Sequence, residues 1–209
     1  KNYGTFVSGD AKKKNMIDIK SYFKTSSLNI GKLHIFEDKI IEISKEILNM
    51  KKANKKLLVA GNGGSCSDAE HFVGELQCTY KDRSRGSVSA ISLASLPAAL
   101  TAWCNDFGFL TFFKRQVQAH GKDGDILFLI STGGGEEKSG ASMSLVEAAK
   151  EAKKKNLKVI SLIGKTGGLL KDISDISIIV DSNITSFIQE AHIAILHCIC
   201  ENLDNELNK

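Results

Sequence analysis

Five short aliphatic runs recur along the chain, and they constrain its fold more than any other feature. They are LLVAG (57–61), SVSAISL (87–93), ILFLIS (126–131), KVISLIG (158–164) and ISIIVDS (176–182). Between and after them lie stretches with helical periodicity, at about 65–80, 95–119, 142–155, 166–172 and 184–207. Near-continuous aliphatic strands that alternate with helices are typical of a parallel sheet covered on both faces. The sequence therefore predicts an α/β fold.

A long amphipathic helix is predicted before the first strand. From Leu33 to Met50, apolar residues recur at intervals of three and four, with charged residues between them. The chain begins with a polar, irregular stretch, KNYGTFVSGDAKKKN. We therefore expect an irregular N-terminal lead-in over residues 1–30. Residues 31–209 should form a single domain, because this length suits one core and no linker divides it.

Charge and cysteine usage exclude several classes of protein. The net charge is +4, and much of the excess lies in lysine clusters at 12–14, 51–52, 55–56 and 153–155. These clusters are typical of solvated helix ends, and no aromatic residues interleave them as in single-strand nucleic-acid binders. No run of 18 apolar residues suggests a membrane span. The five cysteines show no CxxC spacing, which favours a reducing, cytoplasmic location; Cys66, near a helix start, is the one thiol with potential for a lowered pKa.

Glycine- and serine-rich loops follow three of the predicted strands. GNGGS (61–65) joins a strand to a helix, so backbone N–H groups and a helix N-terminus point into one space that favours an anion. Ser65 stands at the expected N-cap, and a plain strand-to-helix turn is the simpler alternative. STGGGEEKSGAS (131–142) follows the third strand, and a second such loop favours a phosphate site. GKTGG (164–168) after the fourth strand could be only a turn that starts a helix.

Titratable side chains lie on two of the predicted helices. His71 and Glu75 follow GNGGS at i, i+4, so they share one helix face. On the last helix, Gln189 and His197 lie about two turns apart, with His192 between them. A surface ion pair and core histidines are the simpler alternatives. The position of His71 and Glu75 directly after a phosphate-type loop favours a functional site.

Four motifs together resemble the bacterial phosphoheptose isomerases of the sugar isomerase (SIS) family. They are AGNGGSCSDAEHFVGEL (60–76), WCNDFGF (103–109), IST (130–132) and IQEAHIAILH (188–197), and the similarity covers about residues 33–207. The resemblance implies a three-layer α/β/α sandwich with a central five-stranded parallel sheet. It also implies a homotetramer, with active sites at subunit interfaces and the first helix helping assembly. The reaction implied converts sedoheptulose 7-phosphate to D-glycero-D-manno-heptose 7-phosphate, for lipopolysaccharide or capsule.

The resemblance also implies roles for individual residues. Glu75 would be the catalytic base and His197 the acid. A Zn²⁺ ion would be held by His71, Glu75, Gln189 and His197, although a Gln amide is a poor zinc ligand and predicts modest affinity. The substrate would contact Asn62, Gly63, Gly64, Ser65, Glu75, Asn105, Asp106, Ser131, Thr132, Ser139, Ser142 and Gln189.

The chain departs from the family pattern in three places. The serine-rich phosphate loop carries a six-residue insertion, Gly133–Lys138, after which Ser139 and Ser142 resume the family's serines. Two glutamates in the insertion would repel a phosphate unless they point away or pair with Lys138. Thr79 stands where the family often has an arginine, and Ser186 where it usually has an aspartate. These departures bear on substrate choice and rate.

Three functions compete on the sequence alone. The first is the isomerase. The second is a non-catalytic SIS protein that binds a protein partner, such as the relatives that bind the replication initiator. Because such a protein needs no paired acid and base, retention of His71, Glu75, Gln189 and His197 favours the isomerase. The third is a sugar-phosphate-sensing regulatory domain, which usually accompanies a DNA-binding segment that these 209 residues do not show.

Overall fold

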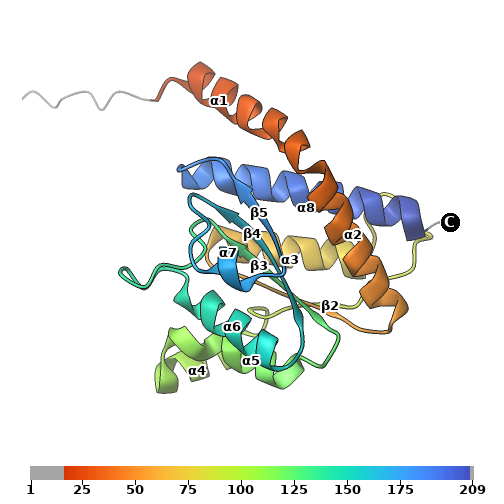
Figure 1. The fold of residues 1–209 in the computed structure, drawn as a ribbon, viewed down its shortest axis with the longest axis vertical. Coiled ribbons are helices and arrows are strands. Elements are labelled where there is room, and N and C mark those ends of the chain that lie inside the picture. The colour runs from red at the N-terminus through yellow and green to blue at the C-terminus, as the bar shows by residue number, and fades with distance from the viewer. Residues whose placement is uncertain (1–16, 208–209) are drawn as a thin grey trace, which may run out of the picture.

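The computed structural model describes residues 17–207, in which strands and helices alternate along most of the chain (Figure 1). The strands are β1 (Leu57–Gly61), β2 (Ala90–Ser92), β3 (Ile126–Ser131), β4 (Lys158–Gly164) and β5 (Ile176–Val180). The helices are α1 (Ile19–Gly31), η1 (Lys32–Phe36), α2 (Glu37–Lys52), α3 (Gly64–Gln77), α4 (Pro97–Phe107), η2 (Phe109–Thr111), α5 (Phe112–His120), α6 (Met143–Lys154), α7 (Leu170–Ile173) and α8 (Thr185–Leu207).

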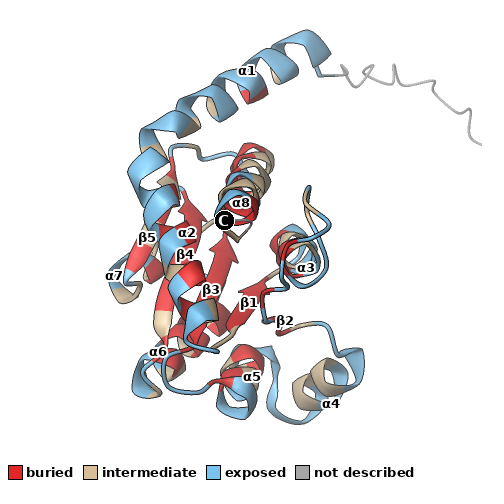
Figure 2. Cartoon of the chain, turned by 90° about the vertical axis from the view of Figure 1, so that its right-hand side faces the viewer, coloured by how far each residue is buried: buried red, intermediate tan, exposed pale blue. Residues whose placement is uncertain are grey.

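The sheet is parallel throughout, in the order β2-β1-β3-β4-β5, and this confirms the predicted fold class. Every residue of β1 and β3 is buried, as expected of strands covered on both faces. One apolar cluster packs α2, α3 and α8 against the sheet, and a second packs α5 and α6 against the other face. Figure 2 shows the resulting three layers, with the buried strands between the two sets of helices.

The N-terminal segment differs from the sequence prediction. The irregular lead-in expected over residues 1–30 is wrong from Ile19 onward, where α1 begins; residues 1–16 lie outside the described part. Asp18 caps the helix by accepting a hydrogen bond from the Ser21 N–H at 3.2 Å. Polar contacts hold it to α8, because Tyr22 and Ser26 both donate to the Glu190 carboxylate, at 2.7 and 2.5 Å. Without a buried apolar stripe, α1 lacks the periodicity that reveals a helix.

Three further boundaries were only approximate. The helix expected from residue 33 starts as the 3₁₀ turn η1 and continues as α2. The helix expected over 95–119 is divided at Gly108, whose φ of 78° ends α4. The strand expected over 87–93 is reduced to three residues, β2. No helix among residues 17–207 is both long and apolar enough to cross a membrane.

The connections that follow the neighbouring strands β1 and β3 leave the sheet on opposite faces. After β1 the chain enters α3 on one face of the sheet, and after β3 it enters α6 on the other (Figures 1 and 2). The two connections therefore diverge at the carboxyl ends of neighbouring strands. In open parallel sheets this divergence leaves a crevice, and ligands bind there.

His192 on α8 should make stability depend on pH. The ring is fully buried near the Ile163 backbone, makes no well-aligned side-chain hydrogen bond, and burial lowers its pKa from 6.5 to about 4. Because the folded pKa is lowered, stability is fully present above pH 6.5 and is lost as the pH falls towards 4. His192→Gln removes this titration and should make the loss smaller by up to about 3 kcal/mol. Urea unfolding at pH 7, 5.5 and 4 gives the free energy of unfolding of the wild type and of the variant. If this free energy falls equally with pH in both proteins, the prediction is wrong.

Candidate active site

A glycine turn joins β1 to α3 at the edge of this crevice. A Cβ on Gly61 would lie 2.3 Å from the Ser65 carbonyl oxygen, and Gly63 has a φ of +56°, so glycine is required at both positions. Gly63 is the N-cap of α3, and Ser65 is buried within the first turn. The prediction that Ser65 is the N-cap was therefore wrong. The turn closes two residues earlier because only glycine adopts this backbone conformation cheaply.

Gln189 on α8 reaches the start of α3. A Cβ on Gly64 would lie 2.4 Å from its Nε2 atom, so the amide sits directly against the Gly64 backbone. The absence of a side chain at Gly64 makes this contact possible. The structure thus brings Gly63, Gly64, Ser65 and Gln189 together, as the sequence predicted from two separate motifs.

The β3 loop lies across the crevice from this turn. Asn62 Nδ2 donates to Ser144 Oγ at 3.4 Å, which ties the β1 turn to the first turn of α6. Ser131 Oγ donates to Ser142 Oγ and accepts from the Gly134 N–H, both at 3.0 Å. Asn62 Oδ1 is buried without a hydrogen-bond partner. Buried polar atoms are rarely left unpaired, so this oxygen is available to a ligand.

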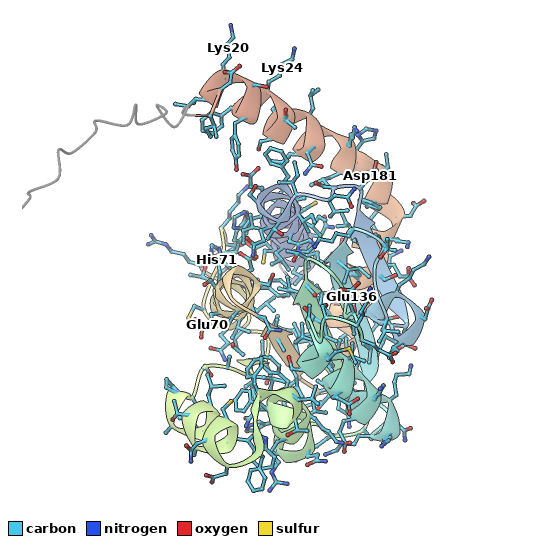
Figure 3. All side chains as sticks on the ribbon, turned by 90° about the vertical axis from the view of Figure 1, so that its left-hand side faces the viewer. Lys20, Lys24, Glu70, His71, Glu136 and Asp181 are labelled. Atoms are coloured by element: carbon cyan, nitrogen blue, oxygen red, sulfur yellow. The ribbon has the colours of Figure 1, made fainter. Side chains whose placement is uncertain are left out.

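The insertion after Thr132 folds against the loop that follows β4. The Leu169 and Leu170 N–H groups donate to the carbonyls of Gly135 and Gly134, at 3.1 and 2.8 Å. Ser139 is exposed and donates to Glu136 at 2.6 Å, so it contacts the insertion rather than Ser131. Glu136 lines a cavity with Lys165 and lies well apart from His71 (Figure 3).

The titratable residues converge between α3 and α8, which pack side by side. His71 Nε2 lies 3.2 Å from Glu75 Oε1 and 3.1 Å from His197 Nε2. The side chains of His71 and Glu75 are 44% and 27% exposed, so this group opens to the surface of the chain. Tyr80 stacks on His197 with its ring centroid 6.0 Å away. The structure thus places the predicted acid and base on either side of His71.

The spacing of this group suits a metal ion in part. Ligand atoms around a tetrahedral zinc lie about 3.3 Å apart, given zinc–nitrogen distances of about 2.0 Å. Both spacings at His71 are close to this value. However, no cluster of three or more His, Cys, Asp or Glu side chains within residues 17–207 is already arranged to hold a metal. The residue types fit zinc, and binding would require the side chains to adjust.

Asp68 was missed by the sequence analysis. It lies on α3 one turn before His71, and its Oδ2 atom is buried without a hydrogen-bond partner. Burial raises the pKa of this carboxyl, and the nearby His71 partly opposes the shift. The spacing of three residues from His71 was a signal for a shared helix face, but an aspartate three residues after the N-cap expected at Ser65 is easily taken for one that only stabilises the start of the helix.

Asn105 and Asp106 stand apart from this group. Asn105 Nδ2 donates to Asp106 Oδ1 at 2.8 Å, and both residues are exposed near the end of α4. This helix buries none of its residues and lies in the layer opposite α3 and α8 (Figure 1). A single chain therefore does not bring this predicted pair to Glu75 and His197.

Gly64→Ala should disturb the position of Gln189. The new Cβ would displace the amide, while alanine suits the first turn of a helix. Gln189 is expected to make one hydrogen bond to the substrate. Its loss should weaken binding of the transition state by about 1–1.5 kcal/mol, so that kcat/KM for the reaction proposed below falls about tenfold. Steady-state kinetics checks this. Gly74→Ala on the same helix is the control, since nothing lies within 4 Å of its added Cβ. Equal kcat/KM in the two variants would refute the role of the Gly64 contact.

Comparison with known proteins identifies the family. Residues 22–164 match the model of the SIS domain. The phosphoheptose isomerase of Citrifermentans bemidjiense is 43% identical over 161 residues, which are 77% of this chain and 80% of the relative. That of Aliarcobacter butzleri is 40% identical over 176 residues, 84% of this chain and 89% of the relative.

Solved structures agree with these sequence relatives. A phosphoheptose isomerase from Francisella tularensis superposes with a TM-score of 0.82 at 34% identity, and the match covers 90% of this chain and 96% of that one. One from Neisseria gonorrhoeae has a TM-score of 0.81 at 31% identity, covering 90% and 97%. The chain belongs to the phosphoheptose isomerase family of SIS-domain proteins.

Proposed function

We propose that the chain interconverts sedoheptulose 7-phosphate and D-glycero-D-manno-heptose 7-phosphate, an aldose–ketose isomerisation that supplies heptose for lipopolysaccharide or capsule. One observation carries the proposal: Glu75 and His197 meet through His71, on the helix that begins at the glycine turn after β1. The membership of the family supports the same reaction.

Glu75 is the proposed base. Moving the carbonyl from C2 to C1 requires loss of a proton from C1 and gain of a proton at C2. A carboxylate can take the first proton and return it to the neighbouring carbon of the enediol. His71, 3.2 Å from Glu75, holds the carboxylate in place. His197 is the proposed acid, which moves protons between the two oxygens of the enediol.

The phosphate end of the substrate is proposed to bind across the crevice. The N–H groups at the start of α3 and its dipole favour an anion there. Hydroxyl groups of Ser65, Ser131, Thr132 and Ser142 would donate to the phosphate oxygens. Ser131 and Ser142 are already paired with each other at 3.0 Å, so the loop is organised before a ligand binds.

A zinc ion is proposed to bind at His71, Glu75, Gln189 and His197. The spacings around His71 and the residue types support it. Gln189 lies against Gly64, which places its amide between α8 and the start of α3. When bound, Zn²⁺ would polarise two substrate oxygens as a Lewis acid. The four side chains orient the substrate from two helices at once.

A homotetramer is proposed as the working assembly. Apolar side chains remain exposed on α1, η1 and α2, and a second group is exposed around α4; they are Ile19, Phe23, Leu28, Ile35, Ile41, Leu96, Phe107, Phe109 and Leu110. The apolar side chains of the helix from residue 33 were expected to drive assembly. Most of them pack inside the single chain instead, since Ile40, Ile43 and Ile47 are buried. The exposed apolar surface lies instead mainly on α1 and around α4. Exposed apolar surface of this extent is typical of interfaces.

A non-catalytic SIS protein that binds a protein partner remains the alternative. The juxtaposition of His71, Glu75 and His197 favours the enzyme, because a binding protein has no need for it.

A cytoplasmic location is also proposed. All five cysteines are unpaired, which suits a reducing compartment.

Glu75→Gln should abolish proton abstraction while keeping the size of the side chain. Turnover of sedoheptulose 7-phosphate should fall by at least about 10²-fold, as is typical when a general base is lost. In D₂O the wild type should incorporate deuterium at C1 or C2, and the variant should not, as NMR of the sugar would show. Glu70→Gln, an exposed change of the same charge on the same helix, is the control. Exchange by Glu75→Gln at the wild-type rate would refute the mechanism.

The assembly is tested by sedimentation at micromolar concentration. We expect a tetramer and no dominant monomer. Replacing Phe23 and Leu28, two exposed apolar residues of α1, by Ser should shift the population towards smaller species. A monomeric wild type with full turnover would rule out an active site shared between subunits.

A further inference from the structure

We propose that Asp204 and Arg85 are positioning residues that hold Glu75 and His197 in register through the loop after α3. The inference rests on the proposed function, since it assigns these two residues to the same site. Neither residue contacts the crevice. They form a buried ion pair, with Arg85 Nε 2.6 Å from Asp204 Oδ1 and side chains only 2% and 7% exposed.

Asp204, on α8, binds the loop between α3 and β2. Its Oδ2 atom accepts hydrogen bonds from the Lys81 and Asp82 N–H groups, at 2.8 and 2.9 Å. Its Oδ1 atom pairs with Arg85, which lies further along the same loop. Asp204 lies seven residues after His197, which places both on the same face of α8. One carboxylate therefore fixes the loop over the helix that carries the proposed acid.

Arg85 ties this arrangement to α3. Its guanidinium donates to the carbonyl of Leu76 at 3.1 Å and also to the carbonyl of Glu75 itself. These carbonyls lie in the last turn of α3, where no further helical N–H is available to them and a cation is favoured by the helix dipole. The end of the helix that carries the proposed base is thus joined to α8 through Arg85 and Asp204.

The loop also contacts His197 directly. Tyr80 stacks on the imidazole with 29° between the ring planes. Lys81 pairs with Glu201 on α8, and its ammonium lies 5.8 Å from the centre of the Tyr80 ring. Asp204 anchors the backbone next to Tyr80 through Lys81. Loss of the Asp204 charge should therefore loosen both the end of α3 at Glu75 and the stack on His197.

A buried ion pair is weak grounds for stability, since apolar replacements are often as stable. Every contact of this pair is directed to the loop or to the helix end that carries Glu75. Catalytic groups displaced by about 1 Å can lose about 10²-fold in rate. Positioning of Glu75 and His197 accounts for the arrangement of these contacts.

Asp125 lies outside α3, α8 and the loop between α3 and β2, and it offers a matched control. It is buried, accepts the Lys56 and Lys122 N–H groups at 3.0 and 2.9 Å, and pairs with Lys56 Nζ at 2.5 Å. Like Asp204, it thus binds two backbone N–H groups and one cation. Asp125→Asn should cost stability in the same way, but its side-chain hydrogen bonds and ion pair go to Lys56 and Lys122, and not to α3, to α8 or to the loop that carries Tyr80.

The test compares Asp204→Asn with Asp125→Asn by thermal melting, by kcat and KM, and by the imidazole ¹⁵N signals of His71 and His197. We expect both variants to melt earlier. Only Asp204→Asn should lower kcat, by about tenfold or more, with KM changed less than about threefold, and only it should shift the two histidine signals. If both variants keep wild-type kcat and histidine signals, the proposal is overturned.

A second variant, Tyr80→Leu, tests the proposal if Asp204→Asn does not fold. Tyr80→Leu keeps an apolar side chain at a half-buried site but removes the stack on His197. It should shift the His197 signal and lower kcat, and wild-type values for both would overturn the proposal. If the wild type itself does not turn over heptose phosphate, the proposed function fails, while the histidine signals still decide whether the loop positions His197.

Discussion

The packing of α3 against α8 is the constraint on which the site depends. Close backbone approaches that only glycine permits fix α8 at two points, one on α3 and one on β4. A side chain on Gly64 would collide with Gln189, and one on Gly164 would come within 2.6 Å of Ile188. These contacts place the start of α8 beside the β1 turn and over the end of β4. The groups that lie two turns further along α8 are then set opposite His71 and Glu75.

The sheet determines which chemistry can be combined at this edge. Because the connections after β1 and β3 leave on opposite faces, their loops form two sides of one crevice. The β1 turn contributes N–H groups and a helix dipole, and the β3 loop contributes hydroxyls. The proposed acid and base lie on α8 and α3, which cover one face of the sheet, whereas the hydroxyls of the β3 loop come from an element that carries neither of them. A change in the β3 loop, such as the insertion after Thr132, can thus alter phosphate recognition while leaving Glu75 and His197 in place.

Sequence patterns predicted the elements whose contacts are local or periodic. β1, β3 and β4 were predicted to the residue because buried parallel strands are continuous aliphatic runs. The meeting of Glu75 and His197 followed from recognised motifs. The helix α1 was missed because polar contacts to Glu190, 164 residues or more away, hold it. The pairing of Arg85 with Asp204 also joins distant positions, and nothing in the local sequence of either residue indicates it.

Exposure of the proposed acid and base connects the chemistry with the assembly. The His71 side chain is 44% exposed in the single chain, so water would screen the charges that stabilise an enediol. Efficient proton transfer requires a covered site, and residues 17–207 leave the His71 side chain nearly half exposed. Meanwhile Asn105 and Asp106 project from α4, a helix without a buried residue, among exposed apolar side chains. A second copy of the chain that covers the site would exclude water from the proposed acid and base. It would also bury the exposed apolar side chains around α4. The proposed tetramer therefore accounts for two features that the single chain leaves incomplete.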